Sequence, residues 1–149
     1  MNLIVKEASI FDTLYLLKLK NDPISIQNSI KQKKVFMAQH LIWMANQKIR
    51  NKSVFFIGYV NNTRIGLCRF QKIFKLNYYE VSIVVDPHFR GLGYAQSFLS
   101  KAIHQFSTNS NLTLRATIKS ENNASRKVFE RTGFRLIEET NKILKYQLH

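Results

Sequence analysis

The chain has 149 residues, of which 45% are hydrophobic and 21% charged, and 23 Lys and Arg against 9 Asp and Glu give a net charge of +14. This composition excludes a disordered chain, and no stretch approaches the roughly 18 consecutive apolar residues that a membrane span needs. Because Glu7 and Asp12 also interrupt the apolar N-terminus that a signal peptide requires, we expect one domain over residues 1–149, located in the cytoplasm and without a membrane as partner.

The first half of the sequence predicts strands and helices in a mixed order. The expected elements are a strand at 2–7, a helix at 10–20, a polar and basic stretch to about Ala38, a helix at 39–50, and strands at 53–60 and 64–71. We expect Asn21-Asp22-Pro23 to end the first helix. The last two strands predict a hairpin, because the Asn61-Asn62 pair between them tolerates the positive φ of a tight turn.

In the second half, strands and helices alternate. The expected elements are a strand at 78–85, a helix at 93–106, a strand at 112–118, a helix at about 123–132, and strands at 133–138 and 142–148. The helix at 93–106 is amphipathic, and one face carries the apolar residues Phe98, Leu99, Ala102, Ile103 and Phe106. These elements predict a mixed α/β fold with an antiparallel middle of the sheet.

Positive charge is concentrated in one part of the sequence, because no carboxylate occurs between Pro23 and Tyr79. The basic residues of this interval are Lys31, Lys33, Lys34, Lys48, Arg50, Lys52, Arg64, Arg69, Lys72 and Lys75. They favour a polyanionic partner, such as nucleic acid, a membrane surface or a phosphate-rich small molecule, unless the charge is a general property without a partner. A single cysteine, Cys68, and four scattered histidines show no metal-ligand spacing, so we expect no metal.

The most informative segment is Val84 to Ala95, where a strand leads into a glycine-bearing turn and the turn leads into a helix. The first N–H groups of that helix have no intrahelical acceptor, and together with the helix dipole they favour an anion. Gly91 and Gly93 allow the backbone to come close to such an anion, and Arg90 adds a positive charge. The loop is therefore predicted to hold a phosphate or pyrophosphate, or else is only a tight turn.

Two motifs resemble the GNAT superfamily of N-acetyltransferases. The first, Arg90-Gly91-Leu92-Gly93-Tyr94-Ala95, is similar to the family signature Arg/Gln-x-x-Gly-x-Gly/Ala, and the second, Asn122 to Phe134, is similar to its Asn-x-x-Ala/Ser-x-x-Leu/Val-Tyr/Phe-x-x-x-Gly-Phe pattern. The resemblance covers about residues 50 to 149 well. It implies a twisted, mostly antiparallel sheet of six to seven strands, splayed at a cofactor cleft and flanked by about four helices.

The resemblance also implies acetyl-CoA as co-substrate, in a cleft between the strands at 78–85 and 112–118. The residues that would hold it are Ile83, Val84 and Val85 along the pantetheine arm, Arg90, Gly91, Leu92, Gly93, Tyr94 and Ala95 at the pyrophosphate, and Asn122, Ser125 and Phe129 at the distal arm and thiol. Asn122 also suits a helix N-cap, and Phe129 also suits a packed core. In many family members a tyrosine at the position of Phe129 protonates the leaving thiolate, so this role is vacant here or is filled from elsewhere.

For the base that deprotonates the amine, Glu80 is the first candidate, because it is the first carboxylate after Asp22 and lies on a strand that would flank the acetyl group. Its alternative role is a pair with a basic neighbour on the sheet. His40 is a second candidate, with a buried structural role as the alternative. Ribosomal-protein acetyltransferases of the family tend to carry a glutamate on the next strand, where this sequence has Thr117, which disfavours a protein N-terminus as acceptor.

The first half of the chain is similar to GNAT enzymes that acetylate amino groups of nucleotide-linked sugars. The similar residues are Leu19-Lys20-Asn21-Asp22-Pro23, Ser29, His40 to Trp43, and Gly66 to Phe70. This similarity implies that Asn21, Trp43 and Arg69 bind the acceptor, with Arg69 suited to a phosphate and Trp43 to a sugar or base.

We therefore expect an N-acetyltransferase that acts on a primary amine, favouring an amino sugar on a nucleotide carrier. The alternatives are an acetyltransferase for another small-molecule or protein amine, a catalytically degenerate CoA-binding domain, and a basic nucleic-acid-binding module. Nucleic acid is disfavoured, because the glycine loop would then be unexplained. GNAT sheets often pair through their closing strands, which makes a homodimer an expectation from the resemblance alone.

Overall fold

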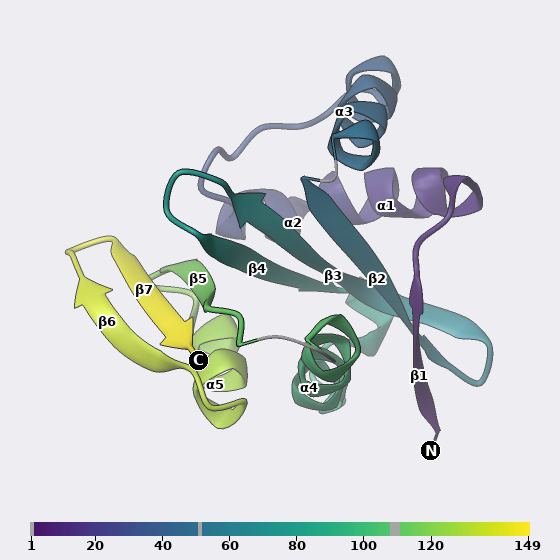
Figure 1. The fold of residues 1–149 in the computed structure, drawn as a ribbon. Helices are drawn as coiled ribbons and strands as arrows, with labels where there is room; N and C mark the ends of the chain where they lie inside the picture. Colours follow the sequence, from purple (N-terminus) through teal and green to yellow (C-terminus); the bar gives the residue numbers. More distant parts are fainter. Residues whose placement is uncertain (1, 51, 108–110) are drawn as a thin grey trace.

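The fold comes from a computed structural model that describes residues 2–50, 52–107 and 111–149. In this part of the chain, seven strands form one sheet in the order β1-β2-β3-β4-β5-β7-β6 (Figure 1). The strands are β1 (Leu3–Glu7), β2 (Ser53–Val60), β3 (Thr63–Ile73), β4 (Tyr78–Val85), β5 (Leu114–Lys119), β6 (Arg135–Glu139) and β7 (Ile143–Leu148). All neighbouring strands are antiparallel except β4 and β5, so the predicted mixed α/β fold with a mostly antiparallel sheet is confirmed.

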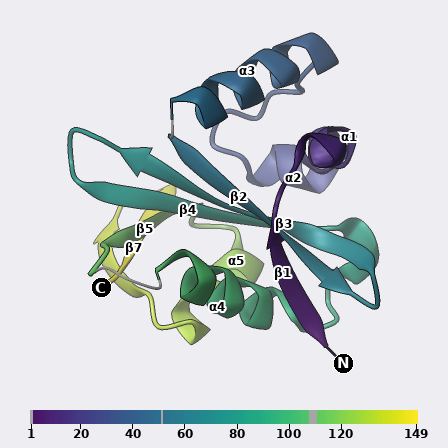
Figure 2. The same ribbon diagram turned by 45° about the vertical axis from the view of Figure 1, so that its right-hand side comes forward.

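The helices lie in two groups on opposite faces of the sheet (Figure 2). One face carries α1 (Thr13–Lys20), α2 (Pro23–Asn28) and α3 (Met37–Ile49), and the other carries α4 (Tyr94–Phe106) and α5 (Asn123–Arg131). Two short 3-10 turns, η1 (Ile10–Asp12) and η2 (Pro87–Phe89), precede α1 and the turn before α4. The described part of the chain thus has five α-helices, one more than the four expected.

The additional helix is α2, which corrects the prediction of a plain polar stretch after Pro23. Asp22 was interpreted only as the end of the preceding helix, but its carboxylate accepts a hydrogen bond from the Ser25 amide at 3.0 Å and so caps α2. Pro23 occupies the first helical turn, where its missing N–H costs nothing. The same three residues therefore end α1 and begin α2.

Each group of helices encloses its own core. On the α4 face, the buried residues Phe98, Leu99 and Ala102 pack against the inner side of the sheet, as the amphipathic pattern predicts. On the α1–α3 face, a smaller cluster joins Leu16 and Met44 to the β2 residues Phe55 and Ile57. The predicted hairpin turn is also confirmed, since Asn61 and Asn62 have φ values of 48° and 62°.

The sheet opens between β4 and β5. Their pairing consists of Tyr79 with Leu114 and Glu80 with Arg115, and no further pair joins these two described strands. From Val81 onward β4 remains paired with β3 on one edge, and β5 does not pair with its other edge. The splay that the sequence analysis expected is therefore present, and Glu80 lies at the point where it begins.

Candidate active site

Glu80 lies on the face of the sheet that α1, α2 and α3 cover. Glu80 pairs with Gln71 of β3, and paired residues have their side chains on the same face of a sheet. Side chains two residues apart on a strand also share a face, so Arg69 of β3 lies on the same face as Glu80. Arg69 in turn lies opposite Phe55, which belongs to the core under α1 and α3. The strand register therefore gathers a carboxylate, a guanidinium and an aromatic core beside the opening of the sheet.

Burial raises the pKa of Glu80 above that of an ordinary glutamate. Hydrogen bonds from Thr117, on β5 across the opening, and the positive charges of Arg69 and Arg115 counteract part of this increase in pKa. A carboxylate with a raised pKa is a stronger base near neutral pH, and its position at the cleft suits proton transfer from a bound amine. Thr117 and Arg115 were not predicted as site residues, and only the register of the splayed strands brings them to Glu80.

Two cations flank the indole of Trp43 on this face. The Lys20 Nζ lies 4.1 Å and the Arg69 guanidinium carbon 5.5 Å from the ring centroid. Burial together with the positive charges of Arg69 and Lys31 lowers the pKa of Lys20. Burial also lowers the pKa of Arg69, although Glu80 opposes this, and the Arg69 Nε is shielded from solvent without a hydrogen-bond partner among the described residues. The cations Lys20, Arg69 and Lys31 therefore outnumber the carboxylate that opposes them, Glu80.

His40, the second base candidate, lies behind Trp43 rather than in the opening. It is 1% exposed, and its ring stacks on the indole with centroids 6.1 Å apart. Burial and the nearby Lys20 charge lower the pKa of His40, whereas a backbone group of Thr13 raises it. These surroundings favour a neutral imidazole that packs against the indole.

Asn21, predicted to bind the acceptor, holds the chain after α2 in place. Its Nδ2 donates to the Val35 carbonyl at 2.6 Å, and its Oδ1 accepts from the Val35 amide at 2.7 Å. Both the nitrogen and the oxygen of the Asn21 side chain are thus hydrogen-bonded to the backbone of Val35. The structure gives Asn21 a part in positioning the segment between α2 and α3, which covers this face of the sheet.

The glycine loop between η2 and α4 has the geometry expected of an anion site. Gly91 and Gly93 have φ values of 74° and 82°, a conformation that other residues rarely adopt, and a Cβ at either position would meet no atom within 4 Å. Gly93 is the N-cap of α4, so the first N–H groups of that helix point out of the loop. The glycines are needed for their backbone conformation, and the space before them is open.

The charge of Arg90 is directed away from this open space. Its Nη2 donates to the Asp22 carboxylate at 2.7 Å and to the Ser25 hydroxyl at 3.3 Å, while its Nε donates to the Val85 carbonyl at 3.0 Å. The guanidinium therefore ties the loop to the start of α2. In this structure the positive charge of Arg90 is paired with the Asp22 carboxylate, and a contact of Arg90 with a phosphate stays a prediction.

The second motif supplies structure as well as candidate contacts. The side-chain Oδ1 of Asn122 accepts from the Ser125 amide at 3.2 Å and caps α5, as its N-cap preference predicts. Phe129 is 2% exposed and packs edge-on against Phe134, with ring centroids 4.9 Å apart. The hydroxyl of buried Tyr146 donates to Glu130 at 2.8 Å and is thereby engaged within the core.

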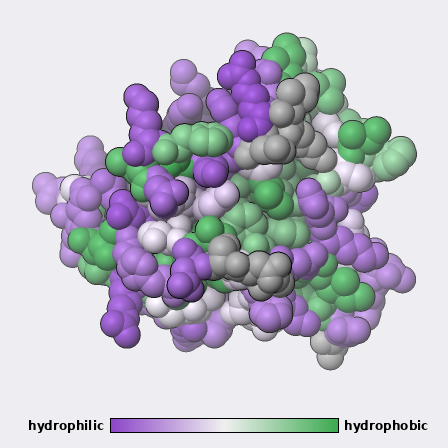
Figure 3. Space-filling model, in the orientation of Figure 1, coloured by the Kyte–Doolittle hydropathy of each residue, from purple (hydrophilic) through white to green (hydrophobic). Residues whose placement is uncertain are grey.

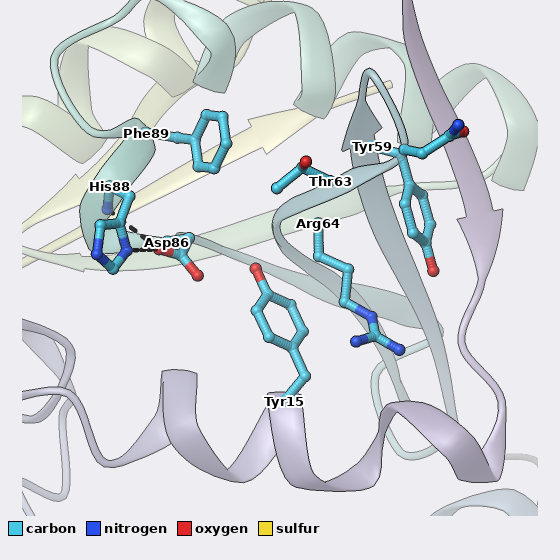
Figure 4. A pocket seen from close by; sticks show the side chains of 8 residues that line it. Tyr15, Tyr59, Thr63, Arg64, Asp86, His88 and Phe89 are labelled. Atoms are coloured by element: carbon cyan, nitrogen blue, oxygen red, sulfur yellow. Dashed lines mark hydrogen bonds and ion pairs between the residues drawn. The ribbon is translucent and has the colours of Figure 1, made fainter.

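A separate polar cavity of about 700 Å³ lies at the other end of β4, and none of the predicted site residues lines it (Figure 4). Tyr15 points toward the Asp86 carboxylate, which accepts from the His88 amide at 3.1 Å and lies 2.9 Å from His88 Nδ1. Arg64, at the opposite wall, donates to Asp12 at 2.8 Å. The charged groups of this cavity thus have partners, and they fix the turn that precedes the glycine loop.

In the described part of the chain, no group of three or more His, Cys, Asp or Glu side chains could hold a metal ion. Cys68 is buried, and burial raises its thiol pKa. Among the described helices, none combines the length and the apolar character that crossing a membrane requires.

A family profile described as "Acetyltransferase (GNAT) domain" matches residues 8–135. Among solved structures, the fold is similar to a spermidine N-acetyltransferase from Vibrio cholerae in complex with CoA and spermine, with a TM-score of 0.85, 16% identity and coverage of 98% of this chain and 94% of that chain. An N-acetyltransferase from Staphylococcus aureus Mu50 matches with a TM-score of 0.81, 22% identity and coverage of 99% and 98%. A ribosomal-protein-alanine N-acetyltransferase from Brucella melitensis matches with a TM-score of 0.81, 18% identity and coverage of 97% and 98%. A comparison with curated protein sequences gives no match.

Proposed function

Because the chain belongs to the GNAT family of acetyltransferases, we propose that it transfers the acetyl group of acetyl-CoA to the primary amine of an amino sugar on a nucleotide carrier. Family membership makes the protein an acyltransferase. The observation that carries the choice of acceptor is the cationic and aromatic face formed by Lys20, Trp43 and Arg69 beside Glu80.

The cofactor part of the proposal follows the open edge of β4. Backbone groups of Ile83, Val84 and Val85 would pair with the pantetheine arm as an added strand, since this edge has no β5 partner. The N–H groups from Arg90 to Ala95 would bind the pyrophosphate at the N-terminus of α4. Asn122, Ser125 and Phe129 would line the distal arm and the thioester. A phosphate group fits the open space in front of Gly91 and Gly93.

In the chemical step, we assign Glu80 rather than His40 as the base. The neutral amine attacks the thioester carbonyl, and its proton passes to the Glu80 carboxylate, directly or through a water molecule. When the tetrahedral intermediate collapses, the carbon–sulfur bond breaks and the CoA thiolate leaves with its electron pair. Phe129 has no proton to give, so the thiolate takes its proton from solvent or from protonated Glu80. The products are the acetylated amine and CoA.

The acceptor part rests on charge. Lys20 and Arg69 carry two positive charges at one aromatic ring, and Lys31 adds a third nearby, while Glu80 is the carboxylate that opposes them. The phosphates of a nucleotide would neutralise these cations through charge-assisted hydrogen bonds, and a sugar or base could stack on Trp43. A polycation such as spermine would meet like charges instead. This argument separates the proposed acceptor from the polyamine in the Vibrio cholerae complex.

The test is an acceptor series measured by thiol release from acetyl-CoA. One amino sugar is supplied both linked to a nucleoside diphosphate and free, with spermidine as a third acceptor. We expect kcat/KM for the nucleotide-linked sugar to exceed the other two by roughly 100-fold, the value of one or two charge-assisted hydrogen bonds to phosphate. A higher kcat/KM for spermidine would overturn the acceptor assignment. Thiol release with any of these amines would exclude a catalytically degenerate domain.

A further inference from the structure

The turn between β3 and β4 combines exposed apolar side chains with lysines, and neither acetyl transfer nor the proposed acceptor accounts for it. Phe74 is 58% and Leu76 65% exposed, within a turn of four residues between Ile73 and Tyr78. Figures 1 and 2 show this turn projecting from the rest of the molecule in both views. More than half of each of these large apolar side chains is therefore open to solvent and available to a partner.

Basic residues surround these apolar side chains. The Lys72 Nζ lies 5.2 Å from the Phe74 ring centroid and 6.0 Å from that of Tyr79. Lys75 lies in the turn itself, and the carbonyl of Lys52, directly before β2, accepts a hydrogen bond of 2.7 Å from the Lys72 amide. Figure 3 shows hydrophilic and hydrophobic areas interspersed over the face of the molecule seen in Figure 1.

The turn carries no opposing negative charge from its own part of the chain. The sequence has no Asp or Glu from Pro23 to Tyr79, and Glu80, the first carboxylate after the turn, faces the α1–α3 side with its charge next to Arg69 and Arg115. Any partner of the turn must therefore accept apolar side chains and supply negative charge at the same place. An anionic lipid surface does both, because acyl chains take up the apolar tip while headgroups attract the lysines.

Against the expectation from the sequence that no membrane is a partner, we propose that the β3–β4 turn docks the protein peripherally on an anionic lipid bilayer, with Phe74 and Leu76 inserted and Lys72 and Lys75 at the headgroups. A nucleic acid would use the lysines, but it offers no apolar phase for Leu76. This inference does not depend on the proposed acceptor.

The experiment is co-sedimentation of the full chain with vesicles of phosphatidylcholine alone or with a quarter of phosphatidylglycerol. We expect binding only to the vesicles that contain phosphatidylglycerol, with the bound fraction falling as salt rises. Phe74→Ser/Leu76→Ser and Lys72→Glu/Lys75→Glu should each weaken this binding by roughly tenfold or more. Circular dichroism and acetyl-CoA binding verify that each variant is folded.

Two matched controls locate the effect. Lys33→Glu/Lys34→Glu makes the same change in net charge at exposed positions outside the turn, and Phe11→Ser/Leu14→Ser removes two exposed apolar side chains at η1 and α1. Both should bind the vesicles as the native chain does. The inference is overturned if the controls and the turn variants weaken binding equally, or if the native chain does not bind at low salt. A third outcome also overturns the inference: Phe74→Ser/Leu76→Ser binds the vesicles normally, and Lys72→Glu/Lys75→Glu loses affinity for both the vesicles and duplex DNA. The turn would then bind polyanions through its lysines alone.

Discussion

The two sites proposed at the carboxyl and amino ends of β4 are built in different ways. At the carboxyl end, the proposed pyrophosphate site is local: η2, the glycine loop and the start of α4 follow one another within the chain, and the proposed binding groups are backbone N–H. At the amino end, Lys20, Trp43, Arg69 and Glu80 come from four different elements and meet only through strand register and helix packing. The cofactor site therefore depends on backbone conformation, and the acceptor site depends on tertiary arrangement.

This difference has a chemical counterpart. Pyrophosphate is the same in every reaction that uses acetyl-CoA, and a fixed set of N–H groups at a helix N-terminus suits it. An acceptor varies between enzymes, and side chains on separate elements can be exchanged without rebuilding the sheet. Arg90 connects the two ends, because its contacts with Asp22 and Ser25 join the glycine loop to α2.

The largest effect should come from Glu80→Gln, which keeps the shape of the side chain but removes the base. We expect kcat/KM to fall by roughly 100- to 1,000-fold, the usual contribution of a general base, measured by thiol release. The matched control is Glu138→Gln, since Glu138 is exposed and pairs with Lys145 on the far edge of the sheet. Unchanged turnover in Glu80→Gln would remove Glu80 from the mechanism.

Arg69→Met should separate acceptors by charge. It keeps much of the apolar contact with Trp43 but removes the guanidinium, so kcat/KM should fall by roughly 10- to 100-fold for a nucleotide-linked amine and by much less for the free amino sugar. Arg135→Met, at an exposed position of β6, serves as the control. An equal loss of kcat/KM for both acceptors would mean that Arg69 stabilises the sheet and does not recognise the phosphates of the acceptor.

At the cofactor end, Gly93→Ala should weaken acetyl-CoA binding by roughly tenfold. Alanine at a φ of 82° costs about 1 to 2 kcal/mol, although its Cβ meets open space, and the loop should relax away from the binding geometry. The control is Gly133→Ala, which has a φ of 100° and comparable strain at a position outside the glycine loop. We expect the control to lower stability while leaving the calorimetric Kd for acetyl-CoA unchanged.

A smaller effect concerns pH. Glu80 acts when deprotonated, so kcat/KM should fall as the pH drops through its raised pKa. The Thr117 hydrogen bonds favour the charged form, and Thr117→Val should therefore raise this pKa and move the acid limb of the pH profile upward by roughly half a pH unit to one. Thr117→Ser retains the hydroxyl and should restore the native profile. A profile that does not move in Thr117→Val would show that Thr117 does not position Glu80.

The smallest effect on catalysis is expected for Arg90→Ala. Loss of the contacts with Asp22, Ser25 and Val85 should reduce the free energy of unfolding by about 1 to 3 kcal/mol, measured in urea. Because the guanidinium does not face the open loop, acetyl-CoA affinity should change less than fivefold. A loss of affinity larger than that of Gly93→Ala would mean that Arg90 turns to the phosphate when the ligand binds.

Much of the fold could be predicted from the sequence, because its signals are local. The Asn61-Asn62 turn, the amphipathic face of α4 and the two glycine-containing motifs each act over a few residues. Helix α2 was not predicted because one signal, Asp22-Pro23, both ends α1 and begins α2, and a helix stop alone explains the same residues.

The acceptor site was predictable only in part. Glu80, Trp43 and Arg69 were selected by residue type and resemblance, but the contacts of Arg115 and Thr117 with Glu80 depend on where β4 and β5 stop pairing. Arg90 and its partner Asp22 are 68 residues apart in the sequence, so no local pattern predicts their contact. The contact of Asn21 with Val35, 14 residues further along the chain, was likewise not predictable from a local pattern.

The most direct test of the division between the two ends is calorimetric titration of acetyl-CoA into the native chain, Glu80→Gln and Gly93→Ala. We predict the same Kd for the native chain and Glu80→Gln, and a Kd roughly ten times higher for Gly93→Ala. The absence of binding to the native chain, or a loss of affinity in Glu80→Gln equal to that in Gly93→Ala, would contradict the account.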